Sequence, residues 1–318
     1  MVQVNEAGFA AADSMERLYE LLQASGMGPG WNKPEPSLWP LPKTNLVPAH
    51  WTYALAKPAL DAAGLYVDTK LAERRNLILF NPAAGDRYAT ARTMIAAYQL
   101  VMSNETARSH RHSPNAMRLV VDARPGAYTV VEGKKIQMVS GDVLLTPNWC
   151  WHGHQNESDS SAYWIDFLDA PLVHLLGPMF FEQFPGGLER AVEVDEHSPM
   201  RFAFADVRRR MDSATETRPG RRELRIGPPY LDTMAIFVSR LEAGGTFVAE
   251  RATANSIFAV IEGHGRSMVD DKEFDWRSGD VFVVPSWHRH RCRALERSYV
   301  LRVTDEPVMQ NFNWLRQE

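Results

Sequence analysis

The chain has 318 residues, of which 45% are hydrophobic and 23% are charged, so it can bury the cores of two domains. The formal net charge of -4 gives no overall positive field for nucleic acid, and no apolar stretch approaches the roughly 20 residues that cross a bilayer. The N-terminus also lacks the regions of a secretory signal, so we expect a cytoplasmic protein that binds neither nucleic acid nor membranes.

The first 70 residues are predicted to form one helix and an extended arm. Asp13, with Glu16 three positions later, indicates a helix cap, and Gly26 indicates the helix end. An apolar stripe lies between them, formed by Met15, Leu18, Leu21 and Leu22. Six prolines between positions 29 and 48 then favour an extended segment that contains Trp31 and Trp39 and leads to Trp51. The arm is expected to cover apolar surface, either on its own barrel or on a neighbouring subunit.

Residues 71–195 are predicted to form a first β-barrel. Short apolar runs at 127–131, 136–138 and 143–146 are separated by turns at Glu132-Gly133 and Ser140-Gly141-Asp142. Closely spaced strands with glycine-containing turns, and with no long helical pattern between them, indicate antiparallel hairpins that close into a jelly roll. The mouth of such a barrel can hold a ligand.

Two pairs of histidines fall in this barrel. His110 and His112 are two positions apart beside one strand signal, and His152 and His154 are two positions apart beside another. Because side chains alternate along a strand, both rings of a pair point to the same face. A third imidazole from a neighbouring strand can complete one face of a metal's coordination sphere. The sequence therefore predicts a metal site in the first barrel.

A second barrel is predicted over residues 196–318 because the chain repeats itself. Ser140-Gly141-Asp142-Val143 recurs as Ser278-Gly279-Asp280-Val281, and a proline and a tryptophan follow each copy at the same spacing. The connection from 169 to 232 is irregular, with helices expected at 172–184 and 199–211 and a boundary near residue 195. The arginine runs at 208–210 and 221–222 are interpreted as solvated faces of this connection.

The repeat does not carry the full set of histidines. Alignment of the two copies places Glu250 opposite His110, Ala252 opposite His112, and His290 opposite His152. We therefore expect no complete metal site in the second barrel. The two cysteines, Cys150 and Cys292, fall in different barrels, so a disulfide is not expected and a reducing compartment is the simple interpretation.

These features resemble a known family. The double set of strands, with H-x-H and P-x-W-x-x-H in its first half, resembles the bicupins. The run S-H-R-H-S-P-N-A-M-R at 109–118, the run L-L-T-P-N-W-C-W-H-G-H at 144–154 and W-I-D at 164–166 resemble the gentisate and salicylate 1,2-dioxygenases. The resemblance implies an all-β bicupin, two jelly-roll barrels in tandem, preceded here by the helix and arm. It also implies a homo-oligomer, with four subunits, in which Fe(II) and dioxygen open an aromatic ring between its carboxyl- and hydroxyl-bearing carbons.

The resemblance also assigns roles to single residues. His110, His112 and His152 match the metal ligands, whereas His154 matches a group near substrate oxygen. Arg118 could grip a substrate carboxylate through two parallel hydrogen bonds, and Arg74 matches a second arginine aimed at that group, although a solvated basic doublet is the alternative for Arg74. Two further residues match positions near the substrate pocket: Gln99 and Asp166. A structural role for Asp166 remains as acceptable as a catalytic one.

The pocket wall departs from the family pattern. Ile95 stands where many members carry tryptophan, and Ala97 stands where salicylate-cleaving relatives can carry glycine. The substrate is therefore expected to be gentisate or a substituted salicylate such as 5-nitrosalicylate. Two other classes stay open: a metal-dependent cupin isomerase or hydrolase acting on a non-aromatic anion, and a small-molecule sensor without turnover. No strand-linked G-x-G-x-x-G indicates a nicotinamide or flavin site.

Overall fold

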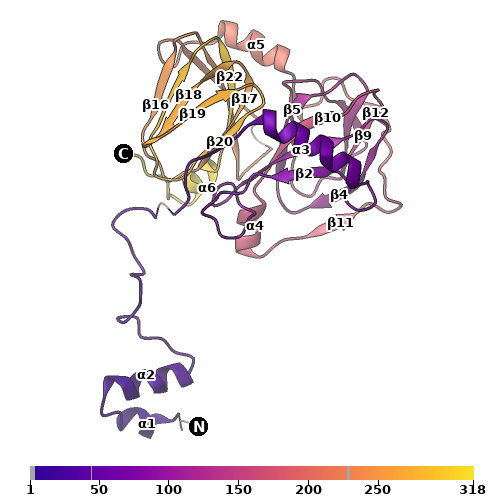
Figure 1. The fold of residues 1–318 in the computed structure, drawn as a ribbon. Helices are drawn as coiled ribbons and strands as arrows, with labels where there is room; N and C mark the ends of the chain where they lie inside the picture. The colour runs from indigo at the N-terminus through magenta and orange to yellow at the C-terminus, as the bar shows by residue number, and fades with distance from the viewer. Residues whose placement is uncertain (1–3, 44, 228–229) are drawn as a thin grey trace. The chain divides into compact units, whose positions relative to one another are not determined.

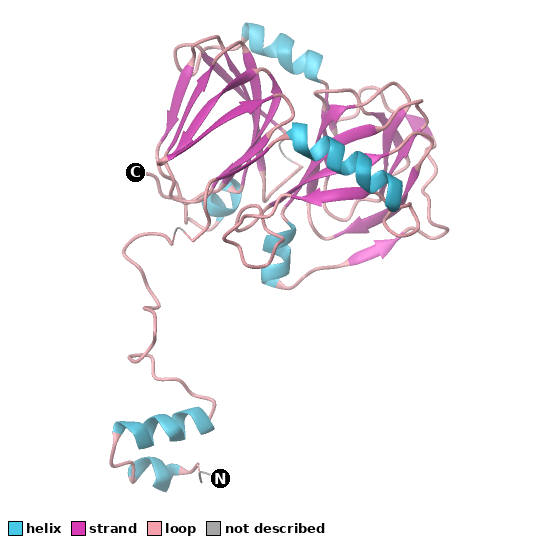
Figure 2. Cartoon of the chain, in the orientation of Figure 1, coloured by secondary structure: helices cyan, strands magenta, loops and turns pink. Residues whose placement is uncertain are grey.

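The structure is a computed structural model that describes residues 4–43, 45–227 and 230–318. The chain divides into two compact units, Met1–Pro42 and Lys43–Glu318. Strands dominate the second unit, as Figure 2 shows by colour, so the predicted all-β bicupin is confirmed. In the described residues, no helix has the length and apolar character needed to cross a bilayer.

The first unit contains the predicted helix and one that the sequence did not predict. Helix α2 spans Met15–Ala24, and its cap is Ser14 rather than Asp13, because the Ser14 hydroxyl accepts a hydrogen bond from the Arg17 N–H at 3.1 Å. A short helix, α1, precedes it at Glu6–Ala10. Leu21, one of the four residues of the predicted apolar stripe, is buried.

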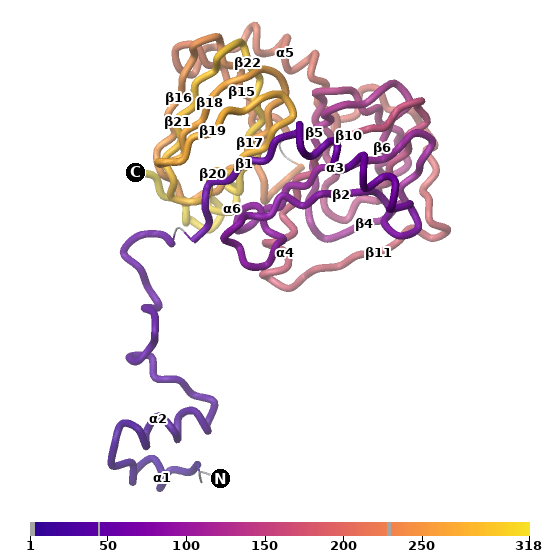
Figure 3. The backbone as a smooth tube through the Cα atoms, viewed as in Figure 1, coloured from indigo at the N-terminus to yellow at the C-terminus, as the bar shows by residue number. Residues whose placement is uncertain are grey.

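The region expected to be an arm also contains ordered elements of the second unit. Strand β1, Ala49–Trp51, pairs with β20, Val281–Val284, of the second barrel, and the two run side by side in Figure 3. Helix α3, Tyr53–Tyr66, follows β1 and was not predicted, and it buries Ala56 and Leu60 against the barrels.

The first barrel consists of two six-stranded sheets (Figure 1). The first has the order β13-β8-β5-β10-β3-β2 and the second the order β11-β4-β9-β6-β7-β12. The strands are β2 Arg75–Ile78, β3 Ile95–Val101, β4 Thr106–His112, β5 Ala116–Asp122, β6 Ala127–Val131, β7 Lys134–Gln137, β8 Val143–Thr146, β9 His152–Asn156, β10 Ala162–Leu168, β11 Phe181–Gln183, β12 Glu193–Val194 and β13 Arg201–Phe202.

The second barrel repeats this plan with a six-stranded and a four-stranded sheet. Their orders are β1-β20-β17-β22-β15-β14 and β16-β21-β18-β19. The strands not yet given are β14 Arg221–Ile226, β15 Ala235–Leu241, β16 Thr246–Ala249, β17 Ser256–Glu262, β18 His264–Val269, β19 Lys272–Arg277, β21 His290–Ala294 and β22 Ser298–Thr304. Helix α6, Glu306–Asn311, follows β22.

The connection between the barrels differs from the expected helices. Helix α4, Ala170–Leu176, ends at Gly177, whose φ of 95° lies in the left-handed region, and residues 181–183 form β11 instead of more helix. The helix expected at 199–211 is α5, Phe204–Ser213, which begins after β13. Strand β13 pairs with β8 of the first barrel, although it lies beyond the expected boundary near residue 195. Arg221 begins β14 and is only 13% exposed, so its expected solvation was wrong.

The core shows why the central strands of the sheets carry apolar side chains on both faces. Outward-facing side chains of the two large sheets share one cluster that contains Met117 and Ile165 from the first barrel and Ile257 and Leu301 from the second. Separate clusters fill the two barrel interiors. The two barrels therefore share one apolar core, and each keeps its own interior. Cys150 and Cys292 are both free thiols, as predicted.

Candidate metal centre

Strands β4 and β9 bring three histidines together. His110 pairs directly with His152, and a register shift between Ala107 and His110 precedes this pair. The rings of His110 and His112 are 4.5 Å and 4.9 Å from the His152 ring, measured between centroids. Each of the three offers a ring nitrogen, and these nitrogens lie within 4.8 Å of one another. The three residues are those that the sequence predicted as ligands.

Backbone carbonyls fix the orientation of the three rings. The Nδ1 atoms of His110, His112 and His152 lie 3.2, 2.8 and 3.0 Å from the carbonyl oxygens of Arg108, Pro114 and Cys150. Because a carbonyl can only accept, each Nδ1 carries the proton and each Nε2 keeps a lone pair. The buried Nε2 of His152 has no hydrogen-bond partner. An unpaired buried lone pair beside two others fits a divalent metal.

The imidazoles also have the protonation state that a metal requires. Burial, reinforced by the neighbouring His110, lowers the pKa of His112 to about 4. Burial likewise holds the pKa of His152 well below its ordinary value. Both rings are therefore neutral at pH 7, which is the form of histidine that binds metals.

Glu73 is a contact of this centre that the sequence analysis missed. Its carboxylate lies 3.2 Å from His110 Nδ1 and within 4 Å of Arg74 and Arg108. Burial acts to raise the pKa of Glu73, but the hydrogen bond to His110 and the nearby positive charges outweigh it and lower that pKa. The carboxylate is therefore ionised and can accept the His110 proton as a hydrogen bond. In the sequence, Glu73 stands before two arginines, and this pattern does not indicate a contact with His110.

Arg118 and Asp166 form the buried floor beside the histidines. Arg118 is 1% exposed, and its Nε forms an ion pair with Asp166 Oδ1 at 3.3 Å without a hydrogen bond. Asp166 Oδ1 accepts a hydrogen bond from the indole of Trp164 at 2.9 Å. Burial lowers the pKa of Arg118, and the charge of Asp166 opposes that shift. The pairing satisfies the requirement that a buried Asp166 have a cationic partner.

Arg118 also holds His154. Its Nη1 lies 2.8 Å from His154 Nδ1, and a second guanidinium nitrogen contacts the Thr146 hydroxyl at 3.2 Å. Burial, followed by the charge of Arg118, holds the pKa of His154 well below its ordinary value. The ring of His154 is 6.1 Å from that of His152, so it lies next to the three-histidine cluster and outside it.

Three residues of β3 line the same face of the barrel interior as this floor. Ala97 is in register with Asp166, and Gln99 accepts a hydrogen bond from Arg74 Nε at 3.1 Å. Because side chains alternate, Ile95 shares their face. Arg74 is 17% exposed, and its terminal nitrogens lie 3.7 Å and 3.9 Å from Glu73 and Asp166. The structure thus brings every predicted site residue to one end of one barrel.

Among the residues that the structure describes, the second barrel does not repeat the histidine cluster. Ala249 pairs with His290 as His110 pairs with His152, so Ala249, and not Glu250, stands at the place of His110. The Trp287 N–H donates to the carbonyl of Ala252, as the Trp149 N–H donates to that of His112, and this confirms the predicted match of Ala252. Glu250 is half-exposed and pairs with Arg289 at 2.8 Å.

Comparison with known proteins agrees with this geometry. The cupin domain family matches residues 97–168 and 237–305, one stretch in each barrel. A gentisate 1,2-dioxygenase from Aquipseudomonas alcaligenes is 30% identical over 97% of both chains, and one from Streptomyces sp is 32% identical over 93% of both. A 5-aminosalicylate 1,2-dioxygenase from Comamonas sp is 30% identical over 96% of this chain and 90% of its own.

Solved structures agree as well. The salicylate 1,2-dioxygenase of Pseudoaminobacter salicylatoxidans, in its adduct with gentisate, superposes with a TM-score of 0.88 at 29% identity, covering 96% of this chain and 94% of that one. The similarity extends over both barrels, so it goes beyond the shared cupin domain. The chain therefore belongs to the gentisate and salicylate 1,2-dioxygenase family of ring-cleaving cupin dioxygenases.

Proposed function

We propose that this enzyme uses Fe(II) to open a salicylate-type ring between the carbons that bear the carboxylate and the hydroxyl. The observation that supports this most strongly is the convergence of three imidazoles beside two arginines inside one barrel. Three histidines leave the charge of a divalent metal unneutralised, and an anionic chelating substrate would neutralise it.

His110, His112 and His152 would hold the metal through their Nε2 atoms. Bound there, Fe(II) would supply open positions at which the two substrate oxygens and dioxygen meet, and it would exchange electron density among them. The protein's own part is to fix the rings through their Nδ1 contacts and to place the substrate beside them.

Arg74 is proposed to bind the substrate carboxylate, with Arg118 behind it. The nearest carboxylates lie beyond hydrogen-bond distance from the terminal nitrogens of Arg74, which leaves those donors available to a ligand. Near the site, three arginines (74, 108 and 118) face two acids (Glu73 and Asp166), which gives an excess of one positive charge. An anionic ring would be attracted to this end of the barrel.

His154 is proposed to donate a proton to a substrate oxygen. Arg118 Nη1 lies 2.8 Å from His154 Nδ1 and 3.1 Å from Nε2, and a guanidinium can only donate; with Nδ1 as the acceptor, the ring proton would be on Nε2. Asp166 would then fix the position of Arg118 through their ion pair, and Arg118 would fix the tautomer of His154.

The substrate class is proposed from the relatives and the pocket wall. Relatives are named for gentisate, 5-aminosalicylate and 1-hydroxy-2-naphthoate, all of which carry adjacent hydroxyl and carboxyl groups. Ile95 and Ala97 present aliphatic surface on the face that carries Gln99. We propose gentisate or a 5-substituted salicylate, 5-nitrosalicylate among them, as the substrate.

Oxygen uptake tests this function. Fe(II)-loaded protein should consume oxygen with at least one of gentisate, salicylate, 5-aminosalicylate, 5-nitrosalicylate and 1-hydroxy-2-naphthoate, and His112→Ala should abolish uptake. Turnover of a non-aromatic anion without oxygen would instead indicate an isomerase or hydrolase. Tight binding of these acids with no turnover would indicate a sensor.

We also propose that the enzyme works in the cytoplasm as a homo-oligomer. Both cysteines are free, and several large apolar side chains are exposed on the described surface, including Trp31, Leu38 and Leu41. Light scattering should give a mass of about four times 35.9 kDa if the family assembly holds. A mass of one chain would contradict this proposal.

A further inference from the structure

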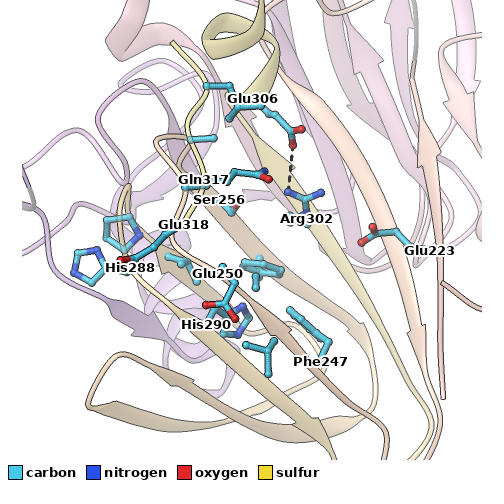
Figure 4. Close-up of a pocket in the computed structure, with 18 of the residues that line it drawn as sticks. Glu223, Phe247, Glu250, Ser256, His288, His290, Arg302, Glu306, Gln317 and Glu318 are labelled. Atoms are coloured by element: carbon cyan, nitrogen blue, oxygen red, sulfur yellow. Dashed lines mark ion pairs between the residues drawn. The ribbon is translucent and has the colours of Figure 1, made fainter. Parts of the chain in front are cut away.

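The second barrel contains a cavity of about 330 Å³ at the place that corresponds to the metal centre of the first (Figure 4). Its walls come from β14, β16, β17, β21, β22 and the C-terminal segment. His290 of β21 lines it from the position that His152 occupies in the first barrel, since His290 pairs with Ala249 of β16 as His152 pairs with His110 of β4. The cavity is therefore the second barrel's version of a site that has lost its metal ligands.

His290 presents an unpaired nitrogen to this cavity. The residue is 1% exposed, its Nε2 lies 2.9 Å from the Ser267 hydroxyl, and its Nδ1 has no partner. The Ser267 oxygen accepts from the indole of Trp276 at 3.1 Å, so its own hydrogen is free to go to His290 Nε2. When that hydrogen goes to Nε2, the ring proton lies on Nδ1, a buried donor without a partner on a residue that lines the cavity. A buried donor without an acceptor is costly, so a ligand that accepts from it would be stabilised.

Strand register shows that the floor of the second barrel has a single positive charge in place of the ion pair of the first. Asp166 is in register with Arg118 in the first barrel, and Arg302 is in register with Phe258 in the second. A cation therefore replaces the buried aspartate, and an aromatic ring replaces the buried arginine. Arg221 corresponds to Arg74. Gln99 of the first barrel and Ser239 of the second are equivalent positions, and each pairs with a residue that lies two positions after the arginine.

The carboxylates around the cavity have partners of their own. Glu223 accepts from both Arg221 and the Ser239 hydroxyl, and Glu250 pairs with Arg289 at 2.8 Å. The nearest carboxylate to Arg302 is Glu306, at 3.6 Å, which is long for a hydrogen bond and is drawn as the dashed line in Figure 4. Of the two lining arginines that lie on strands, Arg221 and Arg302, Arg302 thus has the longer carboxylate contact.

The rest of the lining mixes apolar side chains with polar ones, among them Ser256, His288 and Gln317. Phe247 and Phe258 pack around the His290 ring at centroid distances of 5.0 Å and 4.9 Å, and the other apolar lining residues include Val284, Pro285 and Leu315. An occupant must therefore combine one acceptor of negative charge with an apolar body.

We propose that this cavity binds a small organic carboxylate without a metal, with the carboxylate held between Arg302 and His290 Nδ1 and the body against Phe247 and Phe258. The site is independent of ring cleavage, because it requires neither the metal nor the first barrel. An aromatic and an aliphatic acid share the chemistry that the cavity recognises, so both are needed as probes.

Calorimetric titration of His112→Ala protein with benzoate and with hexanoate tests the proposal, because the ligand set of the first barrel is then broken. We expect one carboxylate to bind per chain. Adding Arg302→Met should weaken binding at least about tenfold, because a buried charge-assisted contact is lost. Adding His290→Phe, which keeps the ring shape and removes the donor, should also weaken it. Arg74→Met, at the matching position of the first barrel, should leave binding unchanged.

Two results would overturn the proposal. One is no binding of either acid to the His112→Ala protein. The other is binding that survives both Arg302→Met and His290→Phe, or that disappears with Arg74→Met. Circular dichroism identifies a variant that fails to fold. If Arg302→Met or His290→Phe does not fold, binding by the other of these two variants tests the proposal. The acid that binds more tightly, benzoate or hexanoate, shows whether the cavity prefers an aromatic or an aliphatic ligand.

Discussion

At the scale of single residues, Glu73 connects the histidine cluster to the arginines around it. Its carboxylate contacts His110 Nδ1 at 3.2 Å and lies near Arg74 and Arg108. A carboxylate behind a ligand histidine fixes the ring and raises its basicity. The second barrel, which lacks the ligand set, has Gly220 at the matching place before Arg221. Glu73 is therefore expected to act on the metal through His110.

Replacing Glu73 should weaken metal binding. We expect Glu73→Ala to lower Fe(II) affinity by about tenfold to a hundredfold, because His110 loses the carboxylate that orients it. Competition with a chromophoric chelator measures this without any turnover. Glu182→Ala is the matched control, since Glu182 pairs with Arg111 on the outer side of β4. Equal affinities for wild type and Glu73→Ala would show that the carboxylate serves only the local ion pairs.

Ile95 is expected to select the ring substituent. It lies on β3 on the same face as Ala97, which is in register with Asp166. Ile95→Trp should change the preference among 5-substituted salicylates by ~1–3 kcal/mol in kcat/KM, the scale of a change in pocket volume. Iron content should stay at the wild-type level. A uniform loss for every substrate, or a loss of iron, would show that Ile95 supports the fold.

At the scale of strands, the period-2 alternation explains what the sequence could predict about the site. The spacing of His110 and His112 on one strand and the repeated S-G-D turn were enough to locate the barrel with the histidine cluster and its copy. The pairing of His110 with His152 depends on a register shift after Ala107, and such irregularities leave no clear trace in a single sequence. For the same reason, Glu250 was matched to His110, although Ala249 takes that place.

Short elements were also hard to predict. Strand β11 has three exposed residues, and it is ordered by pairing with β4 and not by its own apolar pattern. Helix α3 contains Pro58, which obscures its helical pattern, and it is stabilised by packing against the barrels. Tertiary contacts determine whether β11 and α3 form, so the local sequence alone could not predict them.

One metal ion is expected per chain. Metal analysis of the purified protein should find one equivalent, which His112→Ala removes and His290→Ala does not, because the cluster lies in the first barrel alone among the described residues. Two equivalents that are lost together on His112→Ala would contradict this arrangement of ligands.

His290 should make stability depend on pH. Burial, followed by the charges of Arg221 and Arg302, lowers its pKa from 6.5 to about 3. Between these values the unfolded chain binds a proton that the folded chain does not, so stability falls as pH falls below about 6.5. By pH 5, His290 should have cost about 2 kcal/mol of unfolding free energy, and His290→Phe should lack this part of the loss. Urea unfolding of both proteins at pH 7 and pH 5 measures the difference, and parallel losses would contradict the assignment.

At the scale of the whole molecule, the second barrel supports the first. The large sheets of both barrels contribute to one apolar cluster, β1 pairs with β20, and the hydroxyl of Tyr98 in the first barrel donates to the Gly279 carbonyl in the second at 2.7 Å. These contacts explain why a barrel without the ligand set remains in the chain. The repeat predicted two barrels. Only the three-dimensional structure shows that each barrel includes an edge strand from outside its own predicted range.

The central claim is that the three histidines and two arginines of the first barrel form a ring-cleaving centre, and ¹⁸O₂ labelling tests it most directly. Fe(II)-loaded protein is supplied with ¹⁸O₂ and the salicylate-type acid that it consumes fastest, and the product is analysed by mass spectrometry. The account predicts a ring-opened product that carries both ¹⁸O atoms, and none from His112→Ala. A product without ¹⁸O in its new carboxylate, or an intact ring, would contradict it.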